Sequence, residues 1–145
     1  MYKDILLTVD LANLDDEMRA VEFAVEYAST FGSTLHILTV VPDFGLSIVG
    51  SFFPDDHAKT SVAKASAELQ AFTARVIPAD IRHRHIVDHG VIYRIILHYA
   101  REIGCDLIVM SSGRKVDLDD YLLGPNAARV VRHAKCSVHV ARAEG

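Results

Sequence analysis

Three short segments carry side chains that could bind a ligand. Asp10 follows the apolar run Ile5-Leu6-Leu7-Thr8-Val9, and Ser111-Ser112-Gly113-Arg114 follows a second apolar run. The third segment, Gly124-Pro125-Asn126-Ala127, has the composition of a helix start, where unpaired backbone amides and the helix dipole favour an anion. An acid for ribose hydroxyls, together with amides and Arg114 for phosphates, suits a nucleotide.

The elements that position these segments follow from hydrophobic periodicity, which alternates along the chain between strand and helix types. Continuous apolar runs predict strands covered on both faces, and capped runs at helical spacing predict the helices between them. The predicted strands are 5–9, 35–41, about 81–87, 106–110 and 137–142; the predicted helices are 13 or 15 to about 31, 54 to about 76, 91–103 and 124–133. We therefore expect an α/β fold, with one doubly wound five-stranded parallel sheet and helices on both faces, in a single domain over residues 1–145.

The expected order of strands brings the three segments together. In a sheet of this kind the usual order is 3-2-1-4-5, and ligands bind outside the carboxyl ends of strands one and four, where the order reverses. Asp10, the loop after Met110 and the start of the last helix all belong to that edge. The polar stretch 111–123 is also longer than compact domains usually keep without a use.

Composition excludes several other classes of protein. Half of the 145 residues are apolar and 23% are charged, a balance unlike that of a disordered chain or a disulfide-stapled miniprotein. The net charge of −4 has no basic blocks, so nucleic acid is not expected as a partner, and no apolar run approaches a bilayer span. The start of the chain leads directly into a strand, without a signal peptide, and the two cysteines have no metal-binding spacing. We expect a cytoplasmic protein.

Particular segments resemble the universal stress protein family over essentially the whole chain. Ile5 to Asp10 resembles its first strand, Asp106 to Met110 its fourth strand, and Gly90 the glycine before its third helix. Leu122-Leu123-Gly124 with Val130 to Val138 resembles its closing helix and strand, and the wording from Tyr121 to Ala127 is similar to that of short, single-domain bacterial members. The resemblance implies the adenine nucleotide alpha hydrolase-like fold.

The ATP-binding signature of that family is only partly present. Members that bind ATP carry Gly-x2-Gly-x9-Gly-(Ser/Thr), and here these positions hold Ser111, Arg114, Gly124 and Pro125. The spacing is kept, but three of the four signature positions differ. Arg114 offers a guanidinium that can fork onto phosphate, whereas Pro125 removes both a hydroxyl and a backbone N–H.

The resemblance implies a role for each residue of the candidate site. Asp10 would hold the adenosine, with Thr8, Val9 and Val40 lining the adenine pocket. The ribose–phosphate side would be lined by Met110, Ser111, Gly113 and Arg114, with Gly124, Asn126 and Ala127 at the phosphates. The alternative for Asp10 is an acid that caps the loop into the first helix.

The implied ligand is ATP or AMP, and AMP would be less affected by Pro125. Mg²⁺ beside a triphosphate could be recruited by Asp117, Asp119 and Asp120, although a plain solvated loop is the preferred interpretation of these acids. The apolar stretch Phe44 to Phe53 is either a flap or partner surface, or a loop folded over the sheet edge.

The resemblance also implies homodimers formed through the last strand, which would be an open sheet edge. Val138 and Val140 are the residues expected at that interface, and an edge blunted by the tail 142–145 is the alternative.

Two functions remain in view, and neither is that of an enzyme beyond, at most, slow ATP hydrolysis. The first is a dimeric regulatory protein of the stress response that binds an adenine nucleotide, and the second is a nucleotide-independent adaptor of the same fold that acts through protein contacts. An enzyme of the wider fold is not expected, because Asp10-Leu11-Ala12-Asn13 stands where such enzymes have His-Ile-Gly-His, and no nucleophile–base pair emerges.

Histidines and cysteines outside this edge have alternative interpretations. His83 and His85 alternate along a strand, so they could chelate a metal or lie on a solvated face. His139 is expected to be packed or to lie at an interface. Cys105 and Cys136 each precede one of two neighbouring strands, and they are either a redox pair or inert buried thiols.

Overall fold

The computed structural model describes residues 1–42, 54–113 and 123–142 of the chain. Within them, five strands form one fully parallel sheet in the order β3-β2-β1-β4-β5, which confirms the predicted topology. The strands are β1 (Asp4–Thr8), β2 (Thr34–Pro42), β3 (His83–Gly90), β4 (Leu107–Ser111) and β5 (Ser137–Ala141). The strand order reverses between β1 and β4, and the carboxyl ends of these two strands are where this topology places a ligand.

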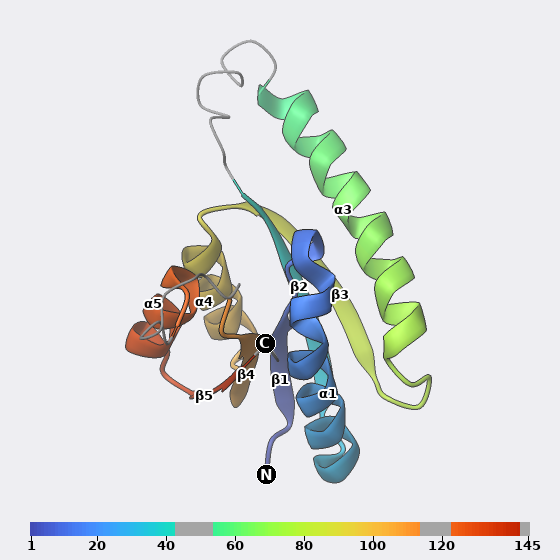
Figure 1. The fold of residues 1–145 in the computed structure, drawn as a ribbon, viewed down its shortest axis with the longest axis vertical. Helices are drawn as coiled ribbons and strands as arrows, with labels where there is room; N and C mark the ends of the chain where they lie inside the picture. Colours follow the sequence, from blue (N-terminus) through green and yellow to red (C-terminus); the bar gives the residue numbers. More distant parts are fainter. Residues whose placement is uncertain (43–53, 114–122, 143–145) are drawn as a thin grey trace.

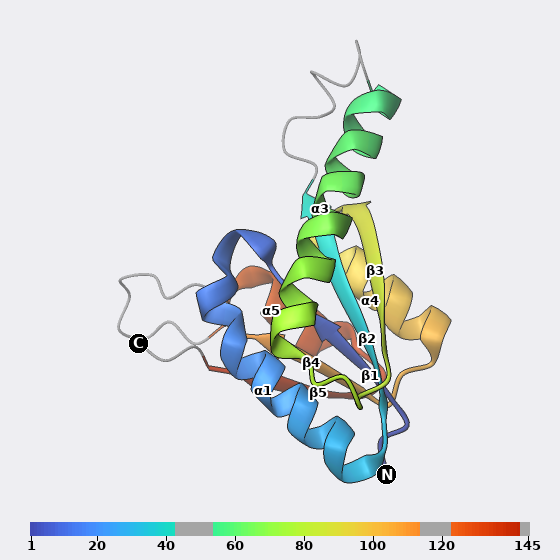
Figure 2. The ribbon, with the colours of Figure 1, turned by 90° about the vertical axis from the view of Figure 1, so that its right-hand side faces the viewer.

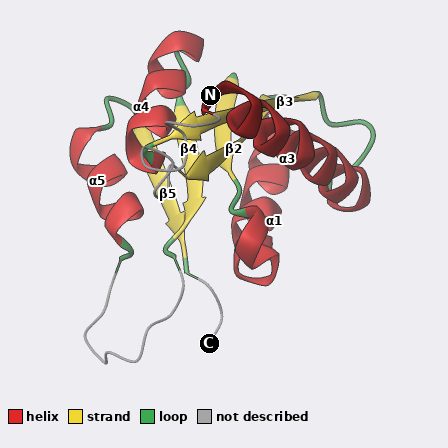
Figure 3. Cartoon of the chain, turned by 90° about the horizontal axis from the view of Figure 1, so that it is seen from above, coloured by secondary structure: helices red, strands yellow, loops and turns green. Residues whose placement is uncertain are grey.

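Helices connect the strands and cover both faces of the sheet. Those described are the short 3-10 helix η1 (Leu11–Asn13) and the α-helices α1 (Leu14–Phe31), α3 (Pro54–Val76), α4 (Ile92–Ile103) and α5 (Pro125–His133). α1 and α3 lie on one side of the sheet, and α4 and α5 lie on the other (Figures 1 and 3). The first turns of α3 project beyond the strands (Figures 1 and 2). No helix in the described ranges is long and apolar enough to cross a bilayer.

Each face of the sheet packs against its own hydrophobic cluster, because successive strand residues point to opposite faces. Ile5 and Leu7 of β1 belong to the cluster with α1 and α3, whereas Leu6 belongs to the cluster with α4 and α5. The apolar residues that α1 and α3 carry at helical spacing include both buried and partly buried positions. The buried ones are Val21, Ala28, Ala65, Leu69 and Phe72, and the partly buried ones are Met18, Val25 and Val62.

The third strand differs most from the prediction. The third strand was expected over about 81–87, but it runs from His83 to Gly90, because it pairs with β2 as far as the partners Pro42 and Gly90. Ile81 instead belongs to a turn, where its N–H donates to the carbonyl of Pro78. The predicted stretch Phe44 to Phe53 lies outside the described residues.

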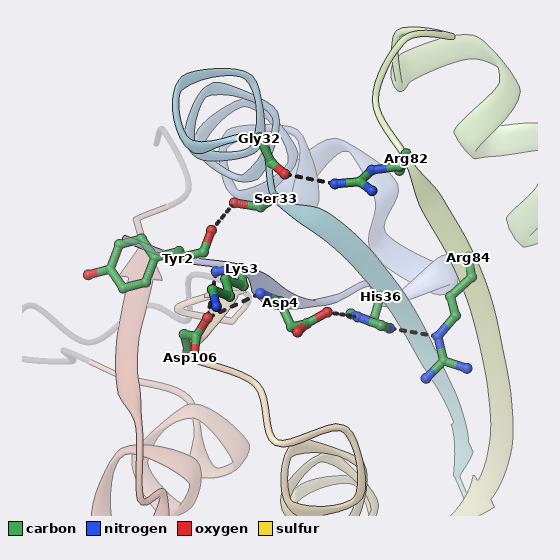
Figure 4. A network of polar contacts seen from close by, with 9 residues as sticks. All are labelled: Tyr2, Lys3, Asp4, Gly32, Ser33, His36, Arg82, Arg84 and Asp106. Carbon is green, nitrogen blue, oxygen red and sulfur yellow. Dashed lines mark hydrogen bonds and ion pairs between the residues drawn. The ribbon is translucent and has the colours of Figure 1, made fainter.

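The amino-terminal edge of the sheet is closed by polar contacts (Figure 4). One Asp106 carboxylate oxygen accepts the backbone N–H groups of Lys3 at 2.5 Å and Asp4 at 3.1 Å, and these bonds lower the pKa of Asp106. The buried His36 lies between Asp4 and Arg84. Its Nε2 is 2.9 Å from the carboxylate of Asp4, and its Nδ1 accepts a hydrogen bond from the Nε of Arg84 at 2.6 Å. The polar groups of this edge are thus paired with one another, at the opposite end of the strands from the expected ligand edge.

Candidate functional site

Asp10 lies directly beyond β1 and caps the short helix that follows. Its Oδ1 accepts the backbone N–H of Ala12 at 3.0 Å, and its Oδ2 accepts the side-chain amide of Asn13 at 2.8 Å. The side chain is exposed. The capping alternative considered for Asp10 is therefore confirmed, although a carboxylate has about four acceptor positions and keeps some of them for a ligand.

Glu17 is a buried carboxyl group beneath this edge. Its side chain, 6% exposed, comes from the first turn of α1, and its Oε1 accepts the backbone N–H of Asp10 at 2.6 Å. Burial raises the pKa of Glu17 to about 7, and the charges of Asp10 and Asp16 add to the rise; the bond from Asp10 and a hydrogen bond with Ser111 oppose it. Glu17 thus binds the backbone directly beyond β1, and the carbonyl of the neighbouring Asp16 accepts the hydroxyl of Ser111 at the end of β4.

The loop after β4 returns to its starting point at the same edge. The N–H of Gly124 donates to the carbonyl of Ser112 at 2.6 Å, so the two ends of the segment between them meet. Gly113 has a φ of +101°, and a Cβ there would lie 3.3 Å from the Cα of Gly124. The Ser111 hydroxyl donates to the carbonyl of Asp16 and lies 3.3 Å from the N–H of Gly113. Bare backbone is needed at Gly113 for this close approach.

α5 begins at this closure and points its first backbone amides toward the edge. Gly124 is its extended N-cap, without a side-chain cap, and the exposed Pro125 occupies the first helical position. Pro125 has no N–H, so the first amides that remain for an anion are those of Asn126 and Ala127. Asn126 is partly exposed and Ala127 is buried.

The residues expected around the adenine are mostly buried. Thr8 and Val9 are each less than 10% exposed, whereas Val40 of β2 is partly exposed; Met110, expected on the ribose–phosphate side, is also buried. Val9 is fixed to β2, because its N–H donates to Leu38 and its carbonyl accepts the hydroxyl of Thr39 at 2.7 Å. The structure therefore brings the carboxyl ends of β1, β2 and β4 and the start of α5 to one edge of the sheet.

Known proteins resemble this chain in both sequence and fold. The sequence model of the universal stress protein family matches residues 1–142. The chain belongs to the universal stress protein family. Universal stress protein G of Escherichia coli O157:H7 is 29% identical over 144 residues, which cover 98% of this chain and all of that protein.

Solved structures of similar proteins share the fold. The structure of hypothetical protein MJ0577, from a test case of structural genomics, has a TM-score of 0.83 at 21% identity, covering all of this chain and 99% of that one. A universal stress protein in complex with cAMP has a TM-score of 0.61 at 23% identity, with 99% and 98% of the two chains covered. At these sequence identities, the likeness to the two solved structures concerns the fold alone.

Part of the site expected for this universal stress protein lies outside the described residues. Arg114, and the acids Asp117, Asp119 and Asp120, fall in the stretch between Gly113 and Leu123. The signature positions Ser111, Gly124 and Pro125 are described, and they meet at one edge as predicted.

Glu17 is the residue that sequence reasoning missed. It stands with Asp15 and Asp16 in an acidic first turn, a pattern that ordinarily complements the helix dipole in solvent. The sequence carries one signal that Glu17 is buried. It stands three residues before the buried Ala20, and residues at this spacing lie on the same, inward side of a helix.

The histidines singled out in the sequence lie away from the site. His139 packs 4.3 Å from the ring of Phe23, and its Nδ1 lies 2.7 Å from the Tyr27 hydroxyl, so the packed alternative is confirmed. Burial lowers the pKa of His139. His83 contacts the carbonyl of Ile81 and His85 contacts the Thr73 hydroxyl of α3, and the described ranges contain no metal-binding group of three or more such ligands.

Proposed function

We propose that this universal stress protein binds an adenine nucleotide at the carboxyl edge of β1 and β4 and acts as a regulatory binding protein without catalysis. The observation that carries the proposal is the closure of Ser112 and Gly113 onto Gly124 at the strand-order reversal. It puts bare backbone and a helix start beside the acid that follows β1, and these are the groups a nucleotide needs.

The parts of the ligand divide among the elements. The remaining acceptor positions of Asp10 suit ribose hydroxyls, and the amides of Asn126 and Ala127 suit a phosphate. Val40, partly exposed at the end of β2, offers an apolar surface for the base. Arg114 would join the phosphate side.

A single phosphate fits this edge better than three. Pro125 removes one amide from the helix start, and the buried Glu17 adds negative charge below the site once it ionises. Losing about two charge-assisted bonds of roughly 1.5–3 kcal/mol each would weaken a triphosphate ~100-fold or more. The cAMP complex of a similar universal stress protein supports a ligand with one phosphate. We therefore place AMP ahead of ATP, with Mg²⁺ needed only by the triphosphate.

A second function keeps the fold and omits the nucleotide. Both carboxylate oxygens of Asp10 already accept hydrogen bonds within the chain, and Pro125 stands where ATP-binding members have serine or threonine. These two observations favour a stress or signalling adaptor that acts through protein contacts.

We also propose a cytoplasmic homodimer that pairs through β5. Among the described residues, this strand is the last of the sheet and pairs with β4 alone, so its other side offers an edge for pairing.

Thermal unfolding with AMP, with Mg-ATP and without ligand tests the choice between the two functions. A ligand at ~100 times its dissociation constant stabilises by roughly 2.7 kcal/mol, which raises Tm by several degrees. We expect AMP to raise Tm of the parent protein, and Pro125→Ser to increase the shift with Mg-ATP. Pro78→Ser, at an exposed turn far from the edge, is the matched control and should leave both shifts unchanged.

The adaptor is the better account if the parent protein shows no shift with either nucleotide. A shift with Mg-ATP that appears only in Pro125→Ser would then identify a site that has lost its ligand.

A further inference from the structure

Two thiols meet at the amino-terminal edge of the sheet, at the far end of the strands from the candidate nucleotide site. Cys105 lies between the end of α4 and the start of β4, and Cys136 immediately precedes β5. β4 and β5 are parallel neighbours, with Leu107 opposite Ser137. The two sulfur atoms are 3.9 Å apart, and both cysteines are free.

The separation is within reach of a covalent bond. Sulfur atoms in a disulfide lie about 2.05 Å apart, so the two thiols must approach by roughly 2 Å, which a small side-chain rotation can supply. Two thiols alone do not make a metal site, because the described ranges hold no set of three suitable ligands. Oxidation is thus the chemistry that this pair supports best.

A cleft gives small molecules access to the pair. Its volume is about 240 Å³, and both cysteines line it together with the ends of α4 and α5. Cys136 is partly exposed, whereas Cys105 is only 7% exposed. The exposed cationic side chains of Arg101 and Lys135 line the same cleft, so a molecule with negative charge is favoured there.

We propose that Cys105 and Cys136 are a thiol–disulfide exchange site that takes small anionic disulfides and closes into a reversible intramolecular disulfide. The Cys136 thiolate attacks one sulfur of the small disulfide, forms a mixed disulfide and releases one small thiolate. The Cys105 thiolate then attacks the sulfur of Cys136 and expels the second small thiolate. Each protein thiol loses one proton and each released thiolate takes up one, so two protein thiols are oxidised while one small disulfide is reduced to two thiols.

Burial sets the rate of this exchange. It raises the pKa of Cys105 to about 12 and also raises the pKa of Cys136; the neighbouring thiol adds to the rise at Cys105, and the negative charge of Asp106 adds to the rise at both. Since the thiolate is the nucleophile, exchange is slow at neutral pH and accelerates as pH rises. Thiols of high pKa are also poor leaving groups, so the disulfide resists reduction once it has formed.

The cross-link would act on the elements that reach the candidate nucleotide edge. The two cysteines are 31 positions apart, and the loop between them contains β4, Gly113, Gly124 and α5. Closing a loop of this length restricts the unfolded chain and raises Tm by about 5 °C or more.

Intact mass after reaction of the reduced full chain with glutathione disulfide, at about pH 8, tests the proposal. We expect a product lighter by two hydrogen atoms, with no bound glutathione and no thiol left for alkylation under denaturing conditions; dithiothreitol should reverse the reaction. In C105S we expect the reaction to stop with one glutathione on Cys136, and in C136S we expect almost no reaction, because Cys105 is buried.

Two further measurements complete the test. The rate should rise up to tenfold per pH unit between about pH 7 and 9, and the cationic disulfide cystamine should react several-fold more slowly at low ionic strength. Two free thiols after prolonged reaction, or a wild-type product that stops at the mixed disulfide, would overturn the intramolecular bond. Cystamine reacting as fast as glutathione disulfide would overturn the preference for anions.

Discussion

At the scale of single residues, the main feature of the edge is an acid held out of water. Glu17 is 6% exposed, and its Oε1 accepts the N–H of Asp10 directly beyond β1. A buried carboxyl group holds its proton more tightly than an exposed one, because charge is costly to desolvate. Folding stability should therefore depend on pH through this one group.

The sign of that dependence follows from the raised pKa. The folded state binds the proton with a pKa of about 7, against 4.5 for an ordinary glutamate, so its contribution to stability is fully present below about pH 4.5. This contribution to stability decreases as pH rises from about 4.5 to about 7. Above about pH 7 it is absent, and Glu17 no longer makes the stability depend on pH. A rise of this size corresponds to about 3 kcal/mol.

Glu17→Gln should remove this pH dependence. The amide keeps the acceptor for the N–H of Asp10 but carries no charge, so we expect a free energy of unfolding about 1–3 kcal/mol higher than that of the parent near pH 8 and little difference near pH 5. Urea denaturation at the two pH values measures this. Glu22→Gln, an exposed position of the same helix, is the control and should change neither value. A Glu17→Gln protein less stable than the parent near pH 8 would contradict the account.

Single residues of the site were predictable where their position along the chain decided their role. Asp10 follows a buried strand, and Gly124 precedes a helix, so both could be placed at the edge from the sequence. For Glu17 the sequence offers one signal, its place three residues before Ala20 on the inward side of α1; that the acid is buried depends on the packing of α1 against β4, which composition does not record. The hydrogen bonds that occupy both Asp10 oxygens likewise depend on the geometry of η1.

At the scale of elements, the site depends on how the chain leaves β4 and returns to α5. The carbonyl of Ser112 accepts the N–H of Gly124, and Gly113 lies against Gly124 with its φ at +101°. Ser112 is also tied to β5, since its N–H donates to Ala141 at 2.8 Å. The closure is therefore a joint between β4, β5 and α5.

Gly113→Ala should disrupt this joint. A Cβ would lie 3.3 Å from the Cα of Gly124, at a φ that side chains rarely adopt, so we expect a loss of roughly 2–3 kcal/mol in stability and a clear loss of nucleotide affinity. Denaturation and calorimetric titration with AMP measure the two effects.

Gly32→Ala is the matched control for that experiment. Gly32 also has a positive φ, of +66°, but a Cβ there meets nothing within 4 Å. We expect a cost of about 1–2 kcal/mol and an unchanged affinity for AMP. If the two variants bound AMP equally well, the closure would not be part of the site.

Elements could be predicted when their own residues decide them. The continuous apolar runs of β1 and β4 are recognisable because both faces of these strands are covered. The end of β3 is not recognisable, because its last residues pair with β2 up to Gly90 while their sequence is polar.

At the scale of the whole molecule, the sheet has two outer strands, β3 and β5. β5 is short, and its valines Val138 and Val140 pack partly against the cluster with α4 and α5. Its outer side therefore offers backbone pairing more than an apolar surface. A second copy could extend the sheet there by the same kind of hydrogen bonds.

Val138→Lys combined with Val140→Lys should shift the protein toward the monomer. Lysines on an edge strand oppose pairing with another edge, and their long stems can leave the core for solvent. Sedimentation velocity measures the change, and circular dichroism establishes that the variant is folded. Val131→Lys, an exposed position on α5 that is 46% accessible, should leave the dimer intact. A parent protein that sediments as a monomer at all concentrations would contradict dimerisation.

The topology of the whole molecule was predictable because few arrangements are open to alternating strands and helices. Right-handed crossovers and the reversal of strand order are enough to place the segment after β1, the segment after β4 and the start of α5 at one edge of the sheet. Which phosphates the edge accepts could not be predicted, since that depends on individual amides near Pro125 and on the charge of Glu17.

The most direct test of nucleotide binding at this edge is a titration of the isotopically labelled protein with AMP, followed through its backbone amide resonances by NMR. We predict shifts at Asp10, Gly113, Gly124, Asn126 and Ala127, with the amides of Lys3, Ser33 and Asp106 at the opposite edge unchanged. Shifts confined to that opposite edge, or none with AMP in large excess, would contradict the account.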